Sequence, residues 1–239
     1  MQQLHYTFGR DERSSYAIFY AVHNRLEELK FNISLYNKSD FLKDNFDVII
    51  NYNAPSPTDD IFEIAKSFQS KRTVLHIDLI NDGKYMMGPM EQACNSYHEL
   101  INYNLIAQLH ADVYIVSDHG FKNFIKVYEE KNYKDKYDFF AFPMPNRHEQ
   151  YAYDFWFMVP KEKNNIFNDW KSYATKNEEI FWCGESYLFR SAQSFGLNVG
   201  FLDRSPCAGM GNPPQYEESS GIFHTHDINR VKILVNEKY

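Results

Sequence analysis

Residues 46–52 read Phe-Asp-Val-Ile-Ile-Asn-Tyr, and residues 73–79 read Thr-Val-Leu-His-Ile-Asp-Leu. The uninterrupted apolar run at 48–50 is typical of a strand that is covered on both faces of a sheet. Between the two stretches, the turn Pro-Ser-Pro-Thr-Asp-Asp at 55–60 starts a helix that continues to Ser67. Strand, helix and strand at this spacing predict a parallel sheet with right-handed crossovers.

The same alternation extends on both sides of this unit. The further elements predicted in this half are a strand at 4–8, a helix at 15–30, a strand at 31–36, a helix at about 90–109, a strand at 112–116, a helix at 119–131 and a strand at 137–142. We expect strands 4–8, 46–51, 73–79 and 112–116 to be parallel neighbours. Ligands bind at the carboxyl ends of such strands. Loops 76–83 and 117–122 are therefore expected to line one crevice.

The second half of the chain has a less regular pattern. It predicts strands at 154–159, 180–183 and 197–202, helices at 161–175 and 186–195, and a loop over 204–222 that is rich in Pro, Gly and Ser. The predicted fold is α/β, with a Rossmann-like parallel sheet flanked by helices in residues 1–145 and a smaller, reduced C-terminal α/β lobe in residues 146–239.

The composition is that of a globular protein, with 44% hydrophobic and 24% charged residues. A net charge of −7 excludes a general field for polyanions, so nucleic acid would need a local basic patch, and none is evident. Three widely separated cysteines exclude both a disulfide framework and a zinc site built on Cys pairs. Because the sequence has neither a signal peptide nor a membrane span, we expect a cytoplasmic protein. Its 18 Tyr and 20 Phe suit wet clefts and self-association into a homo-oligomer.

Two segments carry a resemblance to a known family. Residues 110–124, His-Ala-Asp-Val-Tyr-Ile-Val-Ser-Asp-His-Gly-Phe-Lys-Asn-Phe, resemble an element of glycosyltransferases with the GT-B fold, in which an Ala-Asp strand ends in Ser before a helix. Residues 74–80 match the preceding strand of that family. The order of these segments after 46–51 is similar to the first domain of bacteriophage DNA β-glucosyltransferases. The resemblance implies a nucleotide-sugar donor and a hydroxyl acceptor, which could be a glycan or a modified nucleic acid.

A third segment, Gly184-Glu-Ser-Tyr-Leu-Phe, fits two kinds of glycosyltransferase. It is similar to the stretch where retaining GT-B enzymes place a Glu on the donor nucleotide, although the family's second Glu is missing. It equally resembles the Gly-Glu-Asp-x-x-Phe element of single-domain GT-A enzymes. Both alternatives therefore stay open, and both are sugar transfer.

Sugar transfer needs a base that removes the proton of the acceptor hydroxyl. Asp78 ends an apolar strand whose carboxyl end would face the cleft, so it is our first candidate, and His76, two residues earlier on the same face, is the second. The alternative for Asp78 is a cap or a loop anchor. The alternative for His76 is a hydrogen-bonded histidine of the core.

Groups that neutralise the departing diphosphate are also needed. Arg10 and Arg13, in the loop after the first strand, could donate paired hydrogen bonds, or they could be solvated loop charges. At a helix start, backbone amides suit a phosphate, although capping explains the same residues. The candidates at helix starts are Ser117, Asp118 and His119, with Glu185 as a candidate for the donor ribose.

No metal and no cofactor besides the donor is expected. The chain has no Asp-x-Asp motif, and His224-Thr-His-Asp227 lacks partners that would make it a metal site. We therefore expect a metal-independent glycosyltransferase, GT-B-like with a reduced second lobe. The alternatives are a GT-A-like, single-domain sugar transferase and a non-catalytic, for example viral, protein that binds or sequesters a nucleotide.

Overall fold

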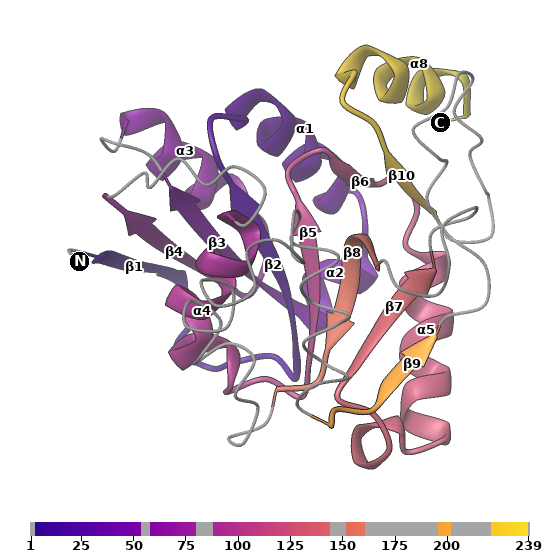
Figure 1. Cartoon of the computed structure of the whole chain (residues 1–239). Helices are drawn as coiled ribbons and strands as arrows, with labels where there is room; N and C mark the ends of the chain where they lie inside the picture. Colours follow the sequence, from indigo (N-terminus) through magenta and orange to yellow (C-terminus); the bar gives the residue numbers. More distant parts are fainter. Residues whose placement is uncertain are drawn as a thin grey trace, which may run out of the picture.

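The computed structural model describes residues 3–53, 58–79, 88–143, 152–160, 196–201 and 221–238 (Figure 1). The strands are β1 (Gln3–Gly9), β2 (Tyr16–Val22), β3 (Phe46–Asn53), β4 (Arg72–Asp78), β5 (Leu105–His110), β6 (Val113–Ile115), β7 (Phe139–Pro143), β8 (Ala152–Met158), β9 (Val199–Phe201) and β10 (Ile222–His224). The helices are α1 (Leu26–Tyr36), α2 (Asp40–Asn45), α3 (Asp59–Ser67), α4 (Gly88–Leu100), α5 (His119–Glu130), the 3-10 turn η1 (Tyr133–Asp135) and α8 (Ile228–Lys238).

Eight strands form one mixed sheet in the order β1-β4-β3-β2-β5-β8-β7-β9. The central strands β4, β3, β2 and β5 are parallel, and helices flank the sheet, so the predicted α/β fold is confirmed. β1, however, is antiparallel to β4, and β8 is antiparallel to β5 and β7. The prediction that strand 4–8 is parallel to its neighbours is therefore wrong. The reason is that only the short link 10–15 joins the end of β1 to the start of β2. A parallel β1 would need a crossover of a dozen or more residues.

The helix predicted over 15–30 is also wrong, since its first half is strand β2. Side chains of β2 alternate between two buried layers: Ile18 and Tyr20 pack on the side of α1 and α3, whereas Phe19 and Ala21 pack on the side of α4. A helix on the sheet surface would bury only one stripe of this run. Every residue of β2 is buried, which only a strand between two helical layers allows. The strand predicted at 31–36 lies in α1.

The helix predicted at 90–109 ends at Leu100, and its last residues form β5. β5 pairs with β2 over residues 105–110. The strand predicted at 112–116 is β6, but it is no neighbour of β4, because it turns out of the main sheet and pairs with β10 instead. Loops 76–83 and 117–122 therefore do not follow adjacent strands.

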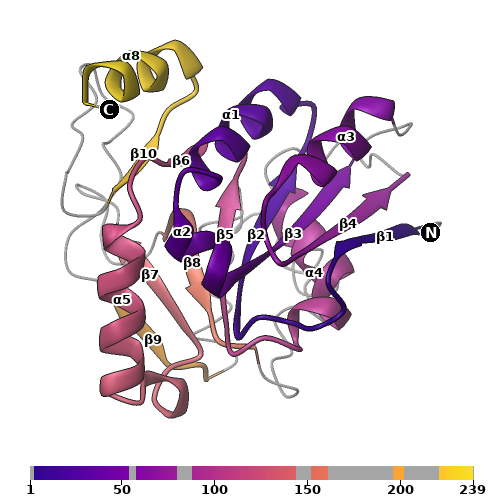
Figure 2. The same ribbon diagram turned by 180° about the vertical axis from the view of Figure 1, so that it is seen from behind.

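Helices cover both faces of the sheet, as the front and back views show (Figures 1 and 2). α1 and α3 pack on one face over β2, β3 and β4, and α5 covers the same face over β7 and β8, where Phe124 stacks on Phe157 with 4.1 Å between ring centroids. α4 covers the other face, with Ala93, Tyr97 and Leu100 in the core. Across the described ranges, no helix has the length and apolar character needed to cross a membrane.

Strands from the second half of the chain complete structures begun by the first. β8 and β9 lie in the eight-stranded sheet, and β10 pairs with β6 beside it, where Val231 of α8 packs against Tyr114 and Phe223. The predicted division into domains at residue 145 stays a prediction. The helices predicted at 161–175 and 186–195 and the strand predicted at 180–183 lie outside the described residues.

Candidate functional site

The carboxyl ends of the four central strands meet at one edge of the sheet and carry polar side chains. The register aligns His76 with Asn51, Asn51 with Ala21, and Ala21 with His110, so β4, β3, β2 and β5 end together. Asp78 ends β4 two residues beyond His76, in register with Asn53 of β3. In open α/β sheets this is the edge at which ligands bind.

At the β5 end of this edge, Asp112 is the centre of a polar group. Its carboxylate is 4% exposed, and its Oδ2 lies 2.8 Å from Nδ1 of His226 and 3.8 Å from Nε2 of His224. Nη1 of Arg25, which precedes α1, lies 3.2 Å from the same oxygen. The antiparallel pairing of β10 with β6 sets His224 opposite Val113, next to Asp112. The two-stranded sheet of β6 and β10 thus brings His224 and His226 close to Asp112, although they are far apart in sequence.

The surroundings of Asp112 keep it ionised. Burial by itself would raise the pKa of this carboxyl group, but charge from His224, His110 and Arg25 holds the pKa well below its usual range. The result is a buried carboxylate at neutral pH, which attracts cationic partners.

This group has the composition of a metal site. Asp112, His224 and His226 each offer a ligand atom, and these atoms lie within 4.8 Å of one another. One carboxylate and two imidazoles suit divalent transition metals. Arg25 offers a second way to supply positive charge at the same place. The arrangement can therefore hold positive charge next to an anionic ligand, with or without a metal.

Asp78 and His76 lie at the other end of this edge. Asp78 is 1% exposed, and its Oδ2 accepts a hydrogen bond of 3.0 Å from Nδ2 of Asn95 in α4. His76 is fully buried, and burial, with smaller contributions from His5 and His98, lowers its pKa to about 3. Their predicted roles as base stay predictions.

Arg10 and Arg13 lie at the opposite end of the sheet from this edge. The backbone N–H of Arg10 donates to the carbonyl of Lys71, just before β4 begins, and Nε of Arg13 lies 3.2 Å from Oε1 of Glu99. A parallel strand 4–8, as expected from the sequence, would have placed the loop after it at the carboxyl ends of the sheet, but β1 is antiparallel to β4. Direct diphosphate binding by these two residues stays a prediction that the placement does not favour.

Ser117, Asp118 and His119 lie at the start of α5 as predicted. The N–H of Ser117 donates to the carbonyl of Gly221, and Oγ of Ser117 lies 2.7 Å from Nδ1 of His119. Asp118 hydrogen-bonds to Ser39 and pairs with Lys122. These contacts occupy the amide of Ser117, which the sequence predicts to face a phosphate. Glu185 lies outside the described residues.

Sequence reasoning missed Asp112 and Arg25. It identified the imidazoles of His224 and His226 and judged them to lack a partner, and the structure supplies one in Asp112. The available signal was the tripeptide His110-Ala-Asp, which places two metal-binding side chain types directly after an apolar strand. No pattern in the sequence points to Arg25.

Comparisons with known proteins find the fold but no sequence relatives. No family model and no curated protein matches the sequence. Mouse xyloside xylosyltransferase 1, in its apo form, is similar with a TM-score of 0.59 at 8% identity, over 90% of this chain and 98% of that chain. A glycosyltransferase involved in glycosylation of the major capsid of PBCV-1 is similar with a TM-score of 0.54 at 10% identity, over 93% of this chain and 98% of that chain. At such identities, these likenesses show a shared fold.

A further structure with a lower score is a mannosyltransferase from Pyrobaculum calidifontis in complex with GDP-Man and Mn2+. Its TM-score is 0.49 at 9% identity, and the match covers 80% of this chain. This chain spans 55% of the length of that protein. The two structures of higher score thus show the fold that this chain shares with them.

Proposed function

We propose that this chain is a glycosyltransferase that moves a sugar from a nucleotide-sugar donor to a hydroxyl acceptor. The observation that carries the proposal is the group formed by Asp112, His224 and His226, with Arg25 beside it, at the carboxyl edge of the sheet. The chain shares its fold with two glycosyltransferases of known structure. The group supplies what the reaction needs, namely positive charge where a diphosphate leaves.

The residues of this group have distinct parts in the proposed reaction. Asp112, His224 and His226 would hold a divalent metal, which neutralises the charge that develops on the leaving diphosphate. Arg25 can donate hydrogen bonds to the same diphosphate, since its guanidinium presents a planar fork of donors. Burial of Asp112 and His224 strengthens both interactions, because charges interact more strongly away from water. The proposed metal departs from the metal-independent transfer that we expect from the sequence.

The arrangement of the sheet favours a GT-A-like, single-domain enzyme over the GT-B-like one. A GT-B enzyme has a second Rossmann domain that faces the first. Within the described residues, β8 and β9 extend the first sheet, and β10 pairs with β6. The strands of the second half thus serve the first half of the fold, which supports one domain built around one sheet.

Asp78 remains the proposed base for the acceptor. It lies three strands from β5, a separation of about 14 Å at roughly 4.8 Å for each strand spacing, so it acts on the acceptor and not on the diphosphate. His76 is the second candidate, because it is fully buried and lies two residues farther from the carboxyl end of β4. Asp78→Asn should lower the transfer rate by roughly 10²–10⁴ while donor affinity changes little.

The test is turnover of nucleotide sugars by the whole chain and by variants of the site. We would screen UDP-, GDP-, ADP- and CMP-sugars by thermal shift with and without Mn2+, and then measure release of the nucleotide diphosphate or monophosphate with a panel of hydroxyl acceptors. His226→Ala should raise the Mn2+ concentration for half-maximal rate by more than about tenfold, the effect of weakening a metal site.

Asp227→Asn is the matched control. This carboxylate is next to His226 in sequence, but it accepts a hydrogen bond from the backbone N–H of Asn229 and lies outside the ligand group. It should leave the Mn2+ dependence unchanged. Binding of a nucleotide sugar without turnover over the whole panel would identify a protein that sequesters the nucleotide. A full rate without Mn2+ would assign the charge neutralisation to Arg25.

A further inference from the structure

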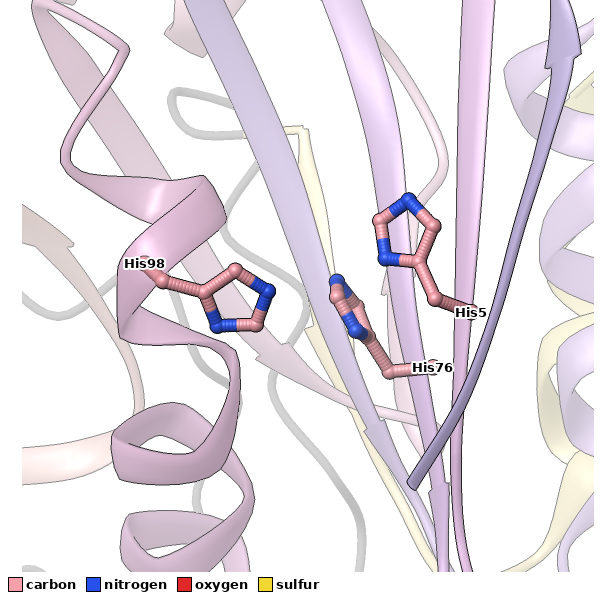
Figure 3. Close-up of side chains that lie close together, drawn as sticks. All are labelled: His5, His76 and His98. Atoms are coloured by element: carbon pink, nitrogen blue, oxygen red, sulfur yellow. The ribbon is translucent and has the colours of Figure 1, made fainter.

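A second group of metal-binding side chains lies on another part of the sheet (Figure 3). His5 comes from β1, His76 from β4 and His98 from α4, and Figure 3 shows the ring of His76 between the other two. The antiparallel register sets His5 directly opposite His76, so both rings lie on the face that α4 covers. A slip of one residue in β1 would move His5 to the other face. Three separate elements therefore bring these imidazoles together.

The distances suit a shared ion after a small adjustment. The ring centroids of His5 and His76 lie 4.7 Å apart, and those of His76 and His98 lie 5.2 Å apart. One ligand nitrogen from each ring lies within 4.8 Å of the other two. Tetrahedral zinc, with bonds of about 2.0–2.1 Å, needs nitrogens about 3.4 Å apart. The rings of His5 and His98 are on exposed residues, so they can close the remaining gap, which is at most about 1.4 Å.

His76 is the unusual member of the group. It is fully buried, and neither of its ring nitrogens has a hydrogen-bond partner among the residues that the structure describes. A buried imidazole must place one N–H and one lone pair, and leaving them unsatisfied costs free energy. A metal ion would satisfy the lone pair. The neutral form of an imidazole is the form that binds metals, and burial keeps the ring of His76 neutral.

The charges around the group do not oppose a cation. The charged groups that act on His76 are Glu99 and Arg72, and these form an ion pair with 2.8 Å between Oε1 and Nη1. Glu99, which Arg13 also contacts, thus offsets part of the charge of Arg72. The group itself contributes no net charge when its rings are neutral.

We propose that His5, His76 and His98 form a zinc site that fastens the edge strand β1 to β4 and α4. An all-imidazole donor set suits Zn2+ and related transition metals and disfavours Mg2+ and Ca2+, which prefer oxygen. Three protein ligands leave the fourth position to water. The site is separate from the group at Asp112, since β3 and β2 lie between β4 and β5. It does not depend on the proposed sugar transfer.

Cobalt(II) absorbance tests the proposal, because tetrahedral Co2+ reports the geometry of a zinc site in the visible range. The whole chain is titrated with Co2+ in excess Mg2+, and Zn2+ is then added to displace it. His98→Ala and His5→Ala remove exposed ligands without touching the buried ring, so both variants should fold. We expect each to weaken Co2+ and Zn2+ binding at this site by more than about tenfold.

The matched control is His226→Ala, which removes a histidine of the other ligand group. The tetrahedral signal should persist in this variant and decrease in His98→Ala. Zn2+ should also raise the melting temperature of the wild type more than that of His5→Ala, because an ion that binds only the folded chain stabilises it. An absent tetrahedral signal in the wild type would overturn the proposal. A signal that survives both His5→Ala and His98→Ala, or that disappears in His226→Ala alone, would overturn it as well.

Discussion

The buried ion pair between Arg72 and Glu99 allows a sharp prediction about stability. Nη1 of Arg72 lies 2.8 Å from Oε1 of Glu99, and their side chains are 7% and 6% exposed. Glu99→Gln keeps the shape of the side chain and leaves the guanidinium buried without its carboxylate. Removing one partner of a buried pair costs about 3–5 kcal/mol.

The surroundings of the pair place the expected loss near the lower end of that range. Nη1 of Arg72 also contacts the hydroxyl of Tyr103, which donates to Oδ2 of Asp47 at 3.1 Å. The charge of Asp47 therefore still offsets part of the stranded cation. We expect Glu99→Gln to lower the free energy of unfolding by about 3 kcal/mol.

Urea unfolding, followed by circular dichroism, measures this loss. With an m-value of about 1–3 kcal/mol/M, the midpoint should fall by roughly 1 M or more while the slope stays the same. Arg13→Ala is the control: it pairs with the same carboxylate, but its side chain is 41% exposed, so it should cost less than about 1 kcal/mol. The double variant Arg72→Met/Glu99→Leu should be close to the wild type. A loss for Glu99→Gln no larger than that for Arg13→Ala would refute the reasoning.

Three further predictions concern stability and the candidate site. Burial raises the pKa of Glu99, but Arg13 and Arg72 lower it by more, so the net pKa lies below the unfolded value of 4.5. The stability that the Glu99 carboxylate contributes is therefore complete above pH 4.5 and is lost as the pH falls. The difference in unfolding free energy between wild type and Glu99→Gln should shrink from about pH 6 to about pH 3, and a constant difference would contradict this. Tyr36→Phe removes a buried hydroxyl whose single hydrogen lies within reach of two main-chain carbonyls, with Phe46 the nearer. The free energy of unfolding should fall by about 1–3 kcal/mol in urea titrations. No change would mean that the carbonyls find other donors. Gly221→Ala places a Cβ 2.1 Å from the carbonyl oxygen of Ser117, at a φ of +69° that favours glycine. It should separate β10 from β6 and so weaken metal binding at the Asp112 group, measured by calorimetry. Wild-type affinity would show that the strands adapt.

The central sheet was predictable from local patterns, and its edges were not. The run at 48–50 and the strand at 73–79 were identified because strands buried on both faces have a distinct composition. β2 was misread because Ile18, Phe19 and Val22 continue into Leu26 and Leu29 at helical spacing, although the strand ends before them. Short apolar runs fit both elements, and only the packing of layers decides between them.

The candidate site was predictable only in part because it is assembled by long-range pairing. The imidazoles of His224 and His226 are visible in the sequence, but their partner at 112 comes close only through the pairing of β6 with β10. Likewise, His5 and His98 lie far from His76 in sequence. The pairing of β1 with β4 brings His5 to His76, and the packing of α4 brings His98 to it. Side chain types and spacing do not record which distant strands are neighbours.

The pairing of β6 with β10 also fixes when, during translation, the ligand group at Asp112 can be completed. Chains are made from the amino end, and early segments fold first. The four parallel central strands lie within the first 110 residues, so they can assemble while β10 is still unmade. During that interval Arg25 is a cation available to Asp112. A nascent chain can therefore form its scaffold with the carboxylate held by an internal cation, and complete the group of Asp112, His224 and His226 only after residue 226 has left the ribosome.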